Sequence, residues 1–274
     1  MNIEMHCHTT CSDGVLTPSE LIAKAAACGL THISVTDHDS VAAYRELRDI
    51  SLRGLCLIPG IEVSARHDGM DIHMLGYYID PFSPTLDGVL EDARAKRAAR
   101  TVRIIEKLEQ GGYDISVDRF EREGLTLNRS NIARMIANNG EAESFDQVFR
   151  ELIGQGCPFY VEKDDMAPEE AIRLIHEVGG IAVIAHARHY GVEHLIPLLA
   201  EKGLDGVECY HSEQDSEDER VLLAIAHDLG LLVTGGSDYH GDAVHPSSLG
   251  GNQPGQEDIE RFLAVGHELG FGEM

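Results

Sequence analysis

Residues 168–186 read PEEAIRLIHEVGGIAVIAH and contain the two patterns that decide the fold class. Pro168 followed by two glutamates is typical of a helix start, and Gly179-Gly180 ends that helix. Residues 181–185 form a nearly continuous apolar run, as expected for a strand that is covered on both faces. A helix followed directly by such a strand is the repeating unit of an α/β sheet.

The same alternation recurs along most of the chain. Thr17-Pro18-Ser19-Glu20 predicts a capped helix that ends at Gly29, and Ser40 is predicted to cap a second helix. Seven β–α units imply a parallel sheet with right-handed crossovers, either open or closed into a barrel. Besides 181–185, strands are predicted at residues 3–5, 32–36, 55–58, 71–79, 206–209 and 231–234.

The alternation is interrupted between about residues 85 and 155, which show helical periodicity only. A long helix is predicted over residues 86–108, stopped by Gly111-Gly112, with capping-box candidates at Asp118 and Ser144. We therefore predict an α/β body formed by residues 1–84 and 160–274, with a helical insert at residues 85–159.

The charge balance limits the classes of partner. The 274 residues include 47 Asp and Glu but 22 Lys and Arg, so the formal net charge is −25. This argues against duplex nucleic acid, which selects a basic surface, but allows a small phosphorylated substrate beside a metal site. No apolar run reaches the about 18 residues of a membrane span. The first residues lack a secretion signal and the six cysteines form no C-x-x-C pair, so we expect a cytoplasmic protein without a membrane partner.

Side chains that favour metal ions follow nearly every predicted strand, at the edge where barrel enzymes place catalytic groups. His6 and His8 are spaced by two, which puts both imidazoles on one face of an extended chain. A carboxylate such as Glu62 can bridge two ions. Nitrogen and oxygen ligands without paired cysteines indicate a hard-to-borderline metal cluster. The candidates at these strand ends are His6, His8, His38, Glu62, His73, His186, Asp238 and His240.

Six motifs, taken in order, resemble the polymerase-and-histidinol-phosphatase (PHP) family of phosphoesterases. They are MHCHTTCSDG, VTDHDS, PGIEVS, DIHMLGY, IAVIAH and TGGSDYHG, and the resemblance covers residues 1–80 and 160–250. The position of the insert is most similar to the stand-alone bacterial branch. Members of that branch hydrolyse small nucleotides, including nucleoside 3′,5′-bisphosphates, and some trim RNA 5′ ends.

The resemblance implies an α/β fold, a distorted (β/α)₇ TIM-like barrel with three divalent metal ions. It implies that His6, His8 and Asp238 hold one ion, and that Glu62 bridges this ion to a second one. By the same resemblance, the second ion is held by His73 and His186, and the third by Asp13, His38 and His240. We expect Mn²⁺, with Zn²⁺ and Fe²⁺ as alternatives, because such ligand sets accept several metals.

We expect Glu62 and Asp238 to act in catalysis by holding a metal-bridging hydroxide as nucleophile. His211 follows a predicted strand and is either the proton donor to the leaving group or a surface histidine. In the insert, residues 127–134 predict a helix N-terminus, capped near Asn128 or Ser130, that favours an anion. The predicted substrate contacts are Arg129, Ser130, Asn131, Arg134 and His189.

Two of these contacts depart from the family pattern. Asn131 stands where relatives have a histidine, and Ala187 and His189 stand where relatives commonly have proline and arginine.

These observations favour hydrolysis of the 3′-phosphate of a nucleoside 3′,5′-bisphosphate, with a small phosphorylated nucleotide as partner. A 5′→3′ exoribonuclease with the same site and a histidinol-phosphate-type phosphatase remain alternatives. A metal-binding accessory module without activity is the alternative outside the enzymes. The sequence leaves the oligomeric state open.

Overall fold

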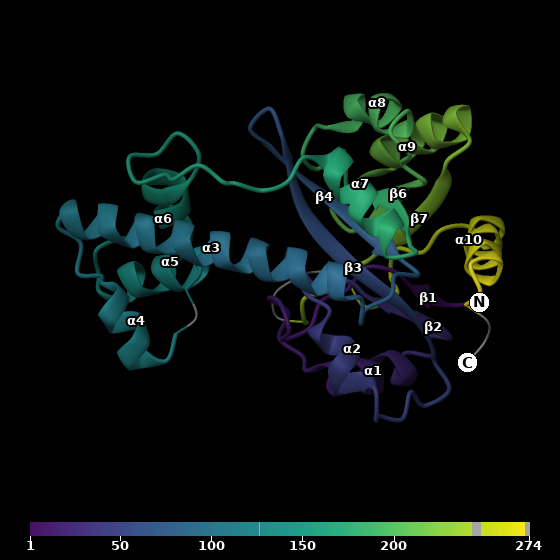
Figure 1. The fold of residues 1–274 in the computed structure, drawn as a ribbon, viewed down its shortest axis with the longest axis horizontal. Coiled ribbons are helices and arrows are strands. Elements are labelled where there is room, and N and C mark those ends of the chain that lie inside the picture. The colour runs from purple at the N-terminus through teal and green to yellow at the C-terminus, as the bar shows by residue number, and fades with distance from the viewer. Residues whose placement is uncertain (126, 243–247, 272–274) are drawn as a thin grey trace. The chain divides into compact units, whose positions relative to one another are not determined.

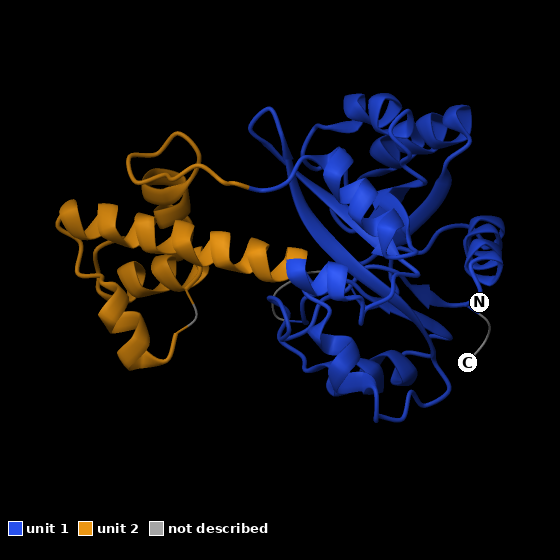
Figure 2. Cartoon of the chain, viewed as in Figure 1, with its two compact units in different colours: residues 1–88, 165–274 blue, residues 89–164 orange. Residues whose placement is uncertain are grey.

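The computed structural model describes residues 1–125, 127–242 and 248–271. The chain divides into two compact units (Figure 2). Unit 1 comprises residues 1–88 and 165–274, and unit 2 comprises residues 89–164.

Unit 1 is an α/β barrel whose seven strands in the described residues lie side by side in chain order (Figure 1). β1, β2 and β3 are parallel, as are β5, β6 and β7. The strands are β1 (Ile3–Glu4), β2 (His32–Val35), β3 (Cys56–His67), β4 (Met70–Tyr77), β5 (Ile181–Ile184), β6 (Gly206–His211) and β7 (Leu232–Gly236).

Helices surround this barrel. α7 packs against β3, β4 and β5, α9 against β6 and β7, and α10 against β7. The predicted capping box at Thr17 is present at the start of α1, whereas Val41, not Ser40, is the N-cap of α2. The helices of unit 1 are α1 (Pro18–Ala27), α2 (Ala42–Leu47), α7 (Pro168–Glu177), the 3₁₀ turn η2 (Glu193–Leu195), α8 (Ile196–Ala200), α9 (Ser216–Leu229) and α10 (Gln256–Glu268).

One strand contradicts the predicted parallel sheet. β4 is antiparallel to both β3 and β5. The turn between β3 and β4 is Asp68-Gly69, and both residues have positive φ, 47° and 83°. An Asp-Gly pair of this kind is a two-residue hairpin turn, which joins antiparallel strands. The dipeptide was therefore the sequence signal that the β–α interpretation overlooked.

The barrel is nearly closed, because β1 and β7 are joined by a few contacts rather than by a full ladder. Cys7 forms a single bridge with Tyr239, and the His8 N–H donates to the Tyr239 carbonyl at 2.9 Å. The buried carboxylate of Glu4 reinforces the closure. It accepts the N–H of His6 and the N–H and hydroxyl of Ser237, at 3.0, 3.0 and 2.6 Å, and the N–H of Gly250 at 2.6 Å.

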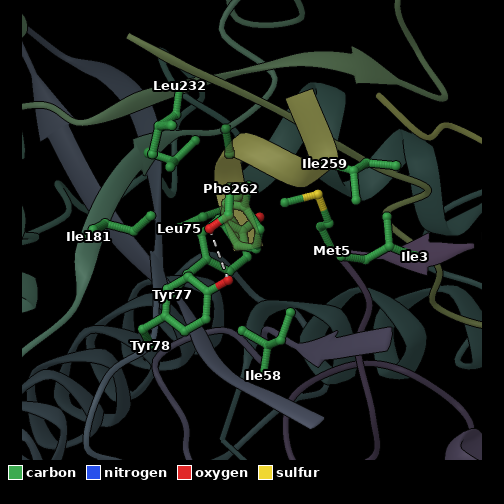
Figure 3. Close-up of a cluster of buried hydrophobic side chains, with 12 residues drawn as sticks. Ile3, Met5, Ile58, Leu75, Tyr77, Tyr78, Ile181, Leu232, Ile259 and Phe262 are labelled. Atoms are coloured by element: carbon green, nitrogen blue, oxygen red, sulfur yellow. Dashed lines mark hydrogen bonds between the residues drawn. The ribbon is translucent and has the colours of Figure 1, made fainter. Parts of the chain in front are cut away.

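The apolar core of unit 1 includes residues at the start of several parallel strands (Figure 3). Ile3, Ile181 and Leu232 stand at strand starts, and Phe262 of α10 packs against them. The rings of Phe262 and Tyr77 meet edge to face, with centroids 5.1 Å apart. Because apolar side chains occupy these strand starts, the opposite strand ends remain for polar groups.

Unit 2 contains most of α3 (Pro84–Gln110), then α4 (Val117–Glu123), α5 (Arg129–Asn138), α6 (Phe145–Val148) and a π-helical turn η1 (Phe149–Ile153). It has its own core, which includes Ile104, Phe120 and Ile132. Ser144 caps α6 as predicted, but α4 is capped by Ser116 and not by Asp118. None of the helices in the described part of the chain combines the length and apolarity of a membrane span.

We predict that Glu4→Gln lowers the free energy of unfolding of the metal-free protein by about 2 kcal/mol, because an amide group would face N–H donors that need an acceptor. Ser237→Ala removes one of these bonds and should cost about 1 kcal/mol. Urea unfolding checks both, with the exposed Glu257→Gln as an unchanged control. An equal loss in Glu4→Gln and Glu257→Gln would contradict the closing role of Glu4.

Candidate metal centre

The centre of the site is the carboxylate of Glu62 on β3, which is fully buried. Five imidazoles from the described residues surround it within 3.2 Å. Oε2 faces His6 Nε2, His8 Nε2 and His38 Nδ1 at 3.2, 3.2 and 3.0 Å. Oε1 faces His73 Nδ1 and His186 Nε2 at 2.8 and 3.1 Å. The two oxygens therefore face two separate groups of histidines, as a bridging carboxylate would.

Two further carboxylates extend the cluster. Asp238 Oδ1 lies 2.9 Å from His8 Nε2 and 3.3 Å from His6 Nε2. Asp13 Oδ1 lies 3.2 Å from His240 Nε2, and Asp13 Oδ2 lies 3.8 Å from the Nε2 of His38. The structure thus brings all nine predicted metal ligands together in unit 1.

The strands explain this convergence. Most of the ligands follow the last residue of a parallel strand, whereas His73 lies in the first half of the antiparallel β4. Because β4 runs in reverse, its first half lies at the same barrel edge, and the His73 carbonyl accepts the N–H of Ala185 just after β5. His186 and Asp238 have φ of 28° and 50°, so the backbone enters the left-handed region two residues after the end of β5 and of β7. This unfavourable conformation is typical of functional sites.

The nitrogen and oxygen atoms of the candidate ligands are arranged for binding divalent cations rather than for hydrogen bonding to one another. His8 Nε2, His38 Nδ1 and Asp238 Oδ1 are buried and have no hydrogen-bond partner among the described residues. Each nevertheless lies within 3.0 Å of a nitrogen or oxygen atom of another candidate ligand. Lone pairs that converge without hydrogen-bond geometry are what nitrogen and oxygen ligands present to a metal. Four overlapping sets in the described residues keep their ligand atoms within 4.8 Å of each other. Three consist of predicted ligands: His6, His8, Glu62 and Asp238; His38, Glu62 and His73; and His8, Asp13, His38 and His240. The fourth is His6, Glu208 and His211.

The electrostatics follow from this crowding. Burial alone would raise the pKa of Glu62, but the neighbouring imidazoles of His38, His6 and His73 outweigh it and hold the pKa well below its usual value. Burial lowers the pKa of His8, but Asp238 and Glu62 outweigh it and raise the pKa to about 10. Burial lowers the pKa of His38 to about 4. Glu62 is therefore ionised and His38 is neutral, which are the forms that bind metal.

Comparison with known proteins decides the family. The sequence profile of the PHP domain matches residues 4–259. The chain belongs to the PHP domain family. A 5′-3′ exoribonuclease of Haemophilus influenzae is 33% identical over 245 residues, which are 86% of this chain and 89% of that protein. A 3′,5′-nucleoside bisphosphate phosphatase of Chromobacterium violaceum is 32% identical over 248 residues, 87% of each chain.

A solved structure agrees with this assignment. A protein from Bifidobacterium adolescentis, described as a candidate metal-dependent phosphoesterase, superposes with a TM-score of 0.81 at 31% identity, and the match covers 96% of this chain and 95% of the other. This PHP protein is accordingly a hydrolase of phosphoric esters with the barrel fold that the sequence predicted.

The PHP centre contains buried carboxylates that the sequence analysis did not single out. Glu208 on β6 accepts from His6 Nδ1 at 2.8 Å and from the His186 N–H at 2.9 Å, so it orients two ligands. Asp37 accepts the N–H and hydroxyl of Thr9, both at 2.7 Å, and fixes the loop after β1. A signal was present: Glu4 and Glu208 interrupt apolar strands, and a carboxylate inside a buried strand needs a polar partner.

His211 of the PHP barrel is buried, so the interpretation as a surface histidine is wrong. Its Nδ1 accepts the N–H of Glu213 at 3.1 Å, which leaves the proton of the neutral ring on Nε2. That atom lies 3.4 Å from Asp238 Oδ2. Burial lowers the pKa of His211, but the nearby carboxylates of Asp238 and Glu208 outweigh this effect and raise the pKa. His211 therefore holds a proton at the edge of the cluster.

The predicted substrate contacts divide between the units. His189 of unit 1 is half exposed, and its Nδ1 lies 2.9 Å from Glu213 Oε2. The other four belong to α5 of unit 2, where Asn128 is the N-cap and accepts the N–H of Asn131 at 2.7 Å. Arg134 Nη1 donates to Asn131 Oδ1 at 2.6 Å, and the guanidinium of Arg129 lies 5.5 Å from the ring of Phe149. Ser130 is exposed.

We predict that Glu62→Ala removes at least one bound ion and lowers kcat by about 100-fold or more, because both carboxylate oxygens of Glu62 face ligand groups. Metal content by mass spectrometry and turnover on a phosphate ester check this prediction. Glu177→Ala, an exposed change on α7, is the matched control. Full metal content with normal turnover in Glu62→Ala would show that the cluster does not bind metal.

We predict that Mn²⁺ binding releases about two protons at neutral pH, because the raised pKa values of His6 and His8 leave both protonated in the metal-free protein. The metal must displace these protons, so the affinity for Mn²⁺ should rise as the pH increases toward about 10. Calorimetric titrations in two buffers of different ionisation enthalpy measure the release. His227→Ala should give the same count, and metal binding without proton release would refute this assignment.

Proposed function

We propose that this PHP phosphoesterase hydrolyses the 3′-phosphate of nucleoside 3′,5′-bisphosphates. The observation that carries the proposal is the arrangement around Glu62, where two groups of imidazoles face one carboxylate from opposite oxygens. Two neighbouring cation sites that share a carboxylate are suited to the hydrolysis of phosphate esters. The 32% identity to a nucleoside bisphosphate phosphatase supports this choice of substrate.

We propose three cation sites, each with Mn²⁺ as the expected ion. His6, His8 and Asp238 would hold one ion, His73 and His186 would hold a second, and Glu62 would be shared by both. Asp13, His38 and His240 would hold the third. When bound, such ions neutralise charge on the phosphoryl oxygens and make water a stronger nucleophile.

The residues of the chain have separate tasks in this proposal. His211 holds a proton at Nε2 beside Asp238, and we propose that this proton passes to the leaving 3′-oxygen. The Glu213 N–H at Nδ1 keeps the ring in this tautomer. Glu208 accepts hydrogen bonds from the His6 ring and from the His186 N–H, so these two ligands are positioned before substrate binds.

The second, non-reacting phosphate is assigned in this proposal to Arg129 and Arg134 of α5. Guanidinium groups match the geometry of a phosphate group, and the positive end of the helix dipole favours an anion. Ser130 and Asn131 lie in that turn.

The relative from Haemophilus influenzae favours a second candidate, a 5′→3′ exoribonuclease that uses the same cluster. The net charge of −25 disfavours tight binding of long RNA, while a short 5′ end needs only a local site.

Phosphate release by Mn²⁺-loaded protein tests the proposal. The panel contains a nucleoside 3′,5′-bisphosphate, the corresponding 3′- and 5′-monophosphates, histidinol phosphate and a short 5′-phosphorylated RNA, each with an EDTA control. We expect the bisphosphate to have the highest kcat/KM and to yield the 5′-monophosphate. Faster shortening of the RNA would replace the proposal with the exoribonuclease, and preference for histidinol phosphate would replace it with the third alternative.

We predict that Arg134→Ala and Arg129→Ala each raise KM for the bisphosphate by about 10-fold, because each loses a charge-assisted hydrogen bond. KM for the 3′-monophosphate, which lacks the second phosphate, should not change. Steady-state kinetics on both substrates make this comparison, with Arg122→Ala on α4 as the control. A parallel rise in KM for both substrates would exclude a separate contact to the second phosphate.

A further inference from the structure

The aromatic ring of Tyr190 borders the metal centre. It meets His186 at a centroid distance of 5.2 Å and His73 at 5.5 Å, with interplanar angles of 63° and 64°. These are two of the imidazoles that face Oε1 of Glu62. Tyr190 is nevertheless 37% exposed. The ring therefore packs edge to face on two cluster residues while part of it stays open to solvent.

The segment that carries Tyr190 is a tight turn that follows β5. The His189 N–H donates to the His186 carbonyl at 2.9 Å, and the Gly191 N–H donates to the Arg188 carbonyl at 3.2 Å. The guanidinium of Arg188 pairs with Asp218 of α9 at 2.8 Å and with Glu193 at 2.5 Å. These bonds hold the turn between β5 and α9.

His189 is a third imidazole in contact with the ring. Its imidazole is nearly perpendicular to the Tyr190 ring, at 84°, with centroids 4.8 Å apart. Glu213, after β6, holds this imidazole at 2.9 Å. The position of the tyrosine is thus fixed before any ligand binds, which lowers the entropy lost on binding.

The other exposed aromatic rings in the described residues, Phe82 and Phe145, pack against neighbouring side chains that lie outside the metal centre. Phe82 is covered by the guanidinium of Arg48 at 4.6 Å, and Phe145 packs against Phe149 at 5.0 Å. Tyr190 instead contacts imidazoles of the predicted metal ligands and of His189. A rigid, half-exposed aromatic ring at the border of a phosphoester site is suited to stack on a nucleobase.

We propose that Tyr190 is a specificity-determining residue that stacks on the nucleobase of the substrate. The nucleoside then lies on the His73 and His186 side of the cluster, and not on the side of Asp13 and His240. This inference rests on the proposed nucleotide substrate, because it assigns a place to the base of that substrate. It also explains how an acidic protein selects a nucleotide, since stacking needs no basic residue.

The test compares a substrate that has a base with one that lacks it. Tyr190→Ala should lower kcat/KM for adenosine 3′,5′-bisphosphate by about 10-fold, with most of the loss in KM. For ribose 3,5-bisphosphate, which has no base, the same change should leave kcat/KM unaltered. Tyr190→Phe keeps the ring and should behave like the unaltered protein on both substrates. Phe82→Ala is the control for loss of an exposed aromatic ring.

Binding of the product, adenosine 5′-monophosphate, gives a readout that needs no turnover. In calorimetric titration its Kd should rise by about 10-fold in Tyr190→Ala and stay constant in Tyr190→Phe. Equal losses on both bisphosphates, or lower metal content in Tyr190→Ala, would show that the ring only supports His73 and His186, and would overturn the inference. If the unaltered protein does not cleave the nucleotide, the proposed function fails. If it cleaves the nucleotide and Tyr190→Ala has no effect, the stacking inference alone fails.

Discussion

The rest of unit 1 depends on one constraint, the buried charge of Glu62. A carboxylate that is removed from water is costly unless positive or polar groups surround it. Five imidazoles meet that need, and they come from four strands or the loops that follow them. A barrel in which strand ends converge is a fold that can supply them. The same crowding leaves donor atoms without hydrogen-bond geometry, so the arrangement is complete only with cations.

A layer of further carboxylates keeps this cluster in place. Glu4 holds the backbone of His6 and Ser237, Glu208 holds His6 and His186, and Asp37 holds the loop that carries Thr9. Part of the net charge of −25 is therefore structural, because these acids fix the loops through N–H groups.

The sequence by itself determined much of the site. The order of strands, the capping box at Thr17 and the nine candidate ligands could be read from motifs, because most of these ligands lie in or shortly after a strand whose pattern is local. The period of two between His6 and His8 already placed both imidazoles on one face. The family followed from the same motifs, and the match over residues 4–259 confirmed it.

Only the tertiary structure decided the rest. The Asp68-Gly69 dipeptide is a local signal for the reversal of β4, but only the folded barrel shows that this reversal brings His73 to the common edge. The burial of His211 depends on the packing of several strands. The edge-to-face contact of Tyr190 with His73 joins segments that are far apart in the chain. The roles of Glu4 and Glu208 also arise from partners distant in sequence, such as Ser237 and His6. Local patterns specify which residues carry the chemistry, whereas distances between separate strands exist only after the chain has folded.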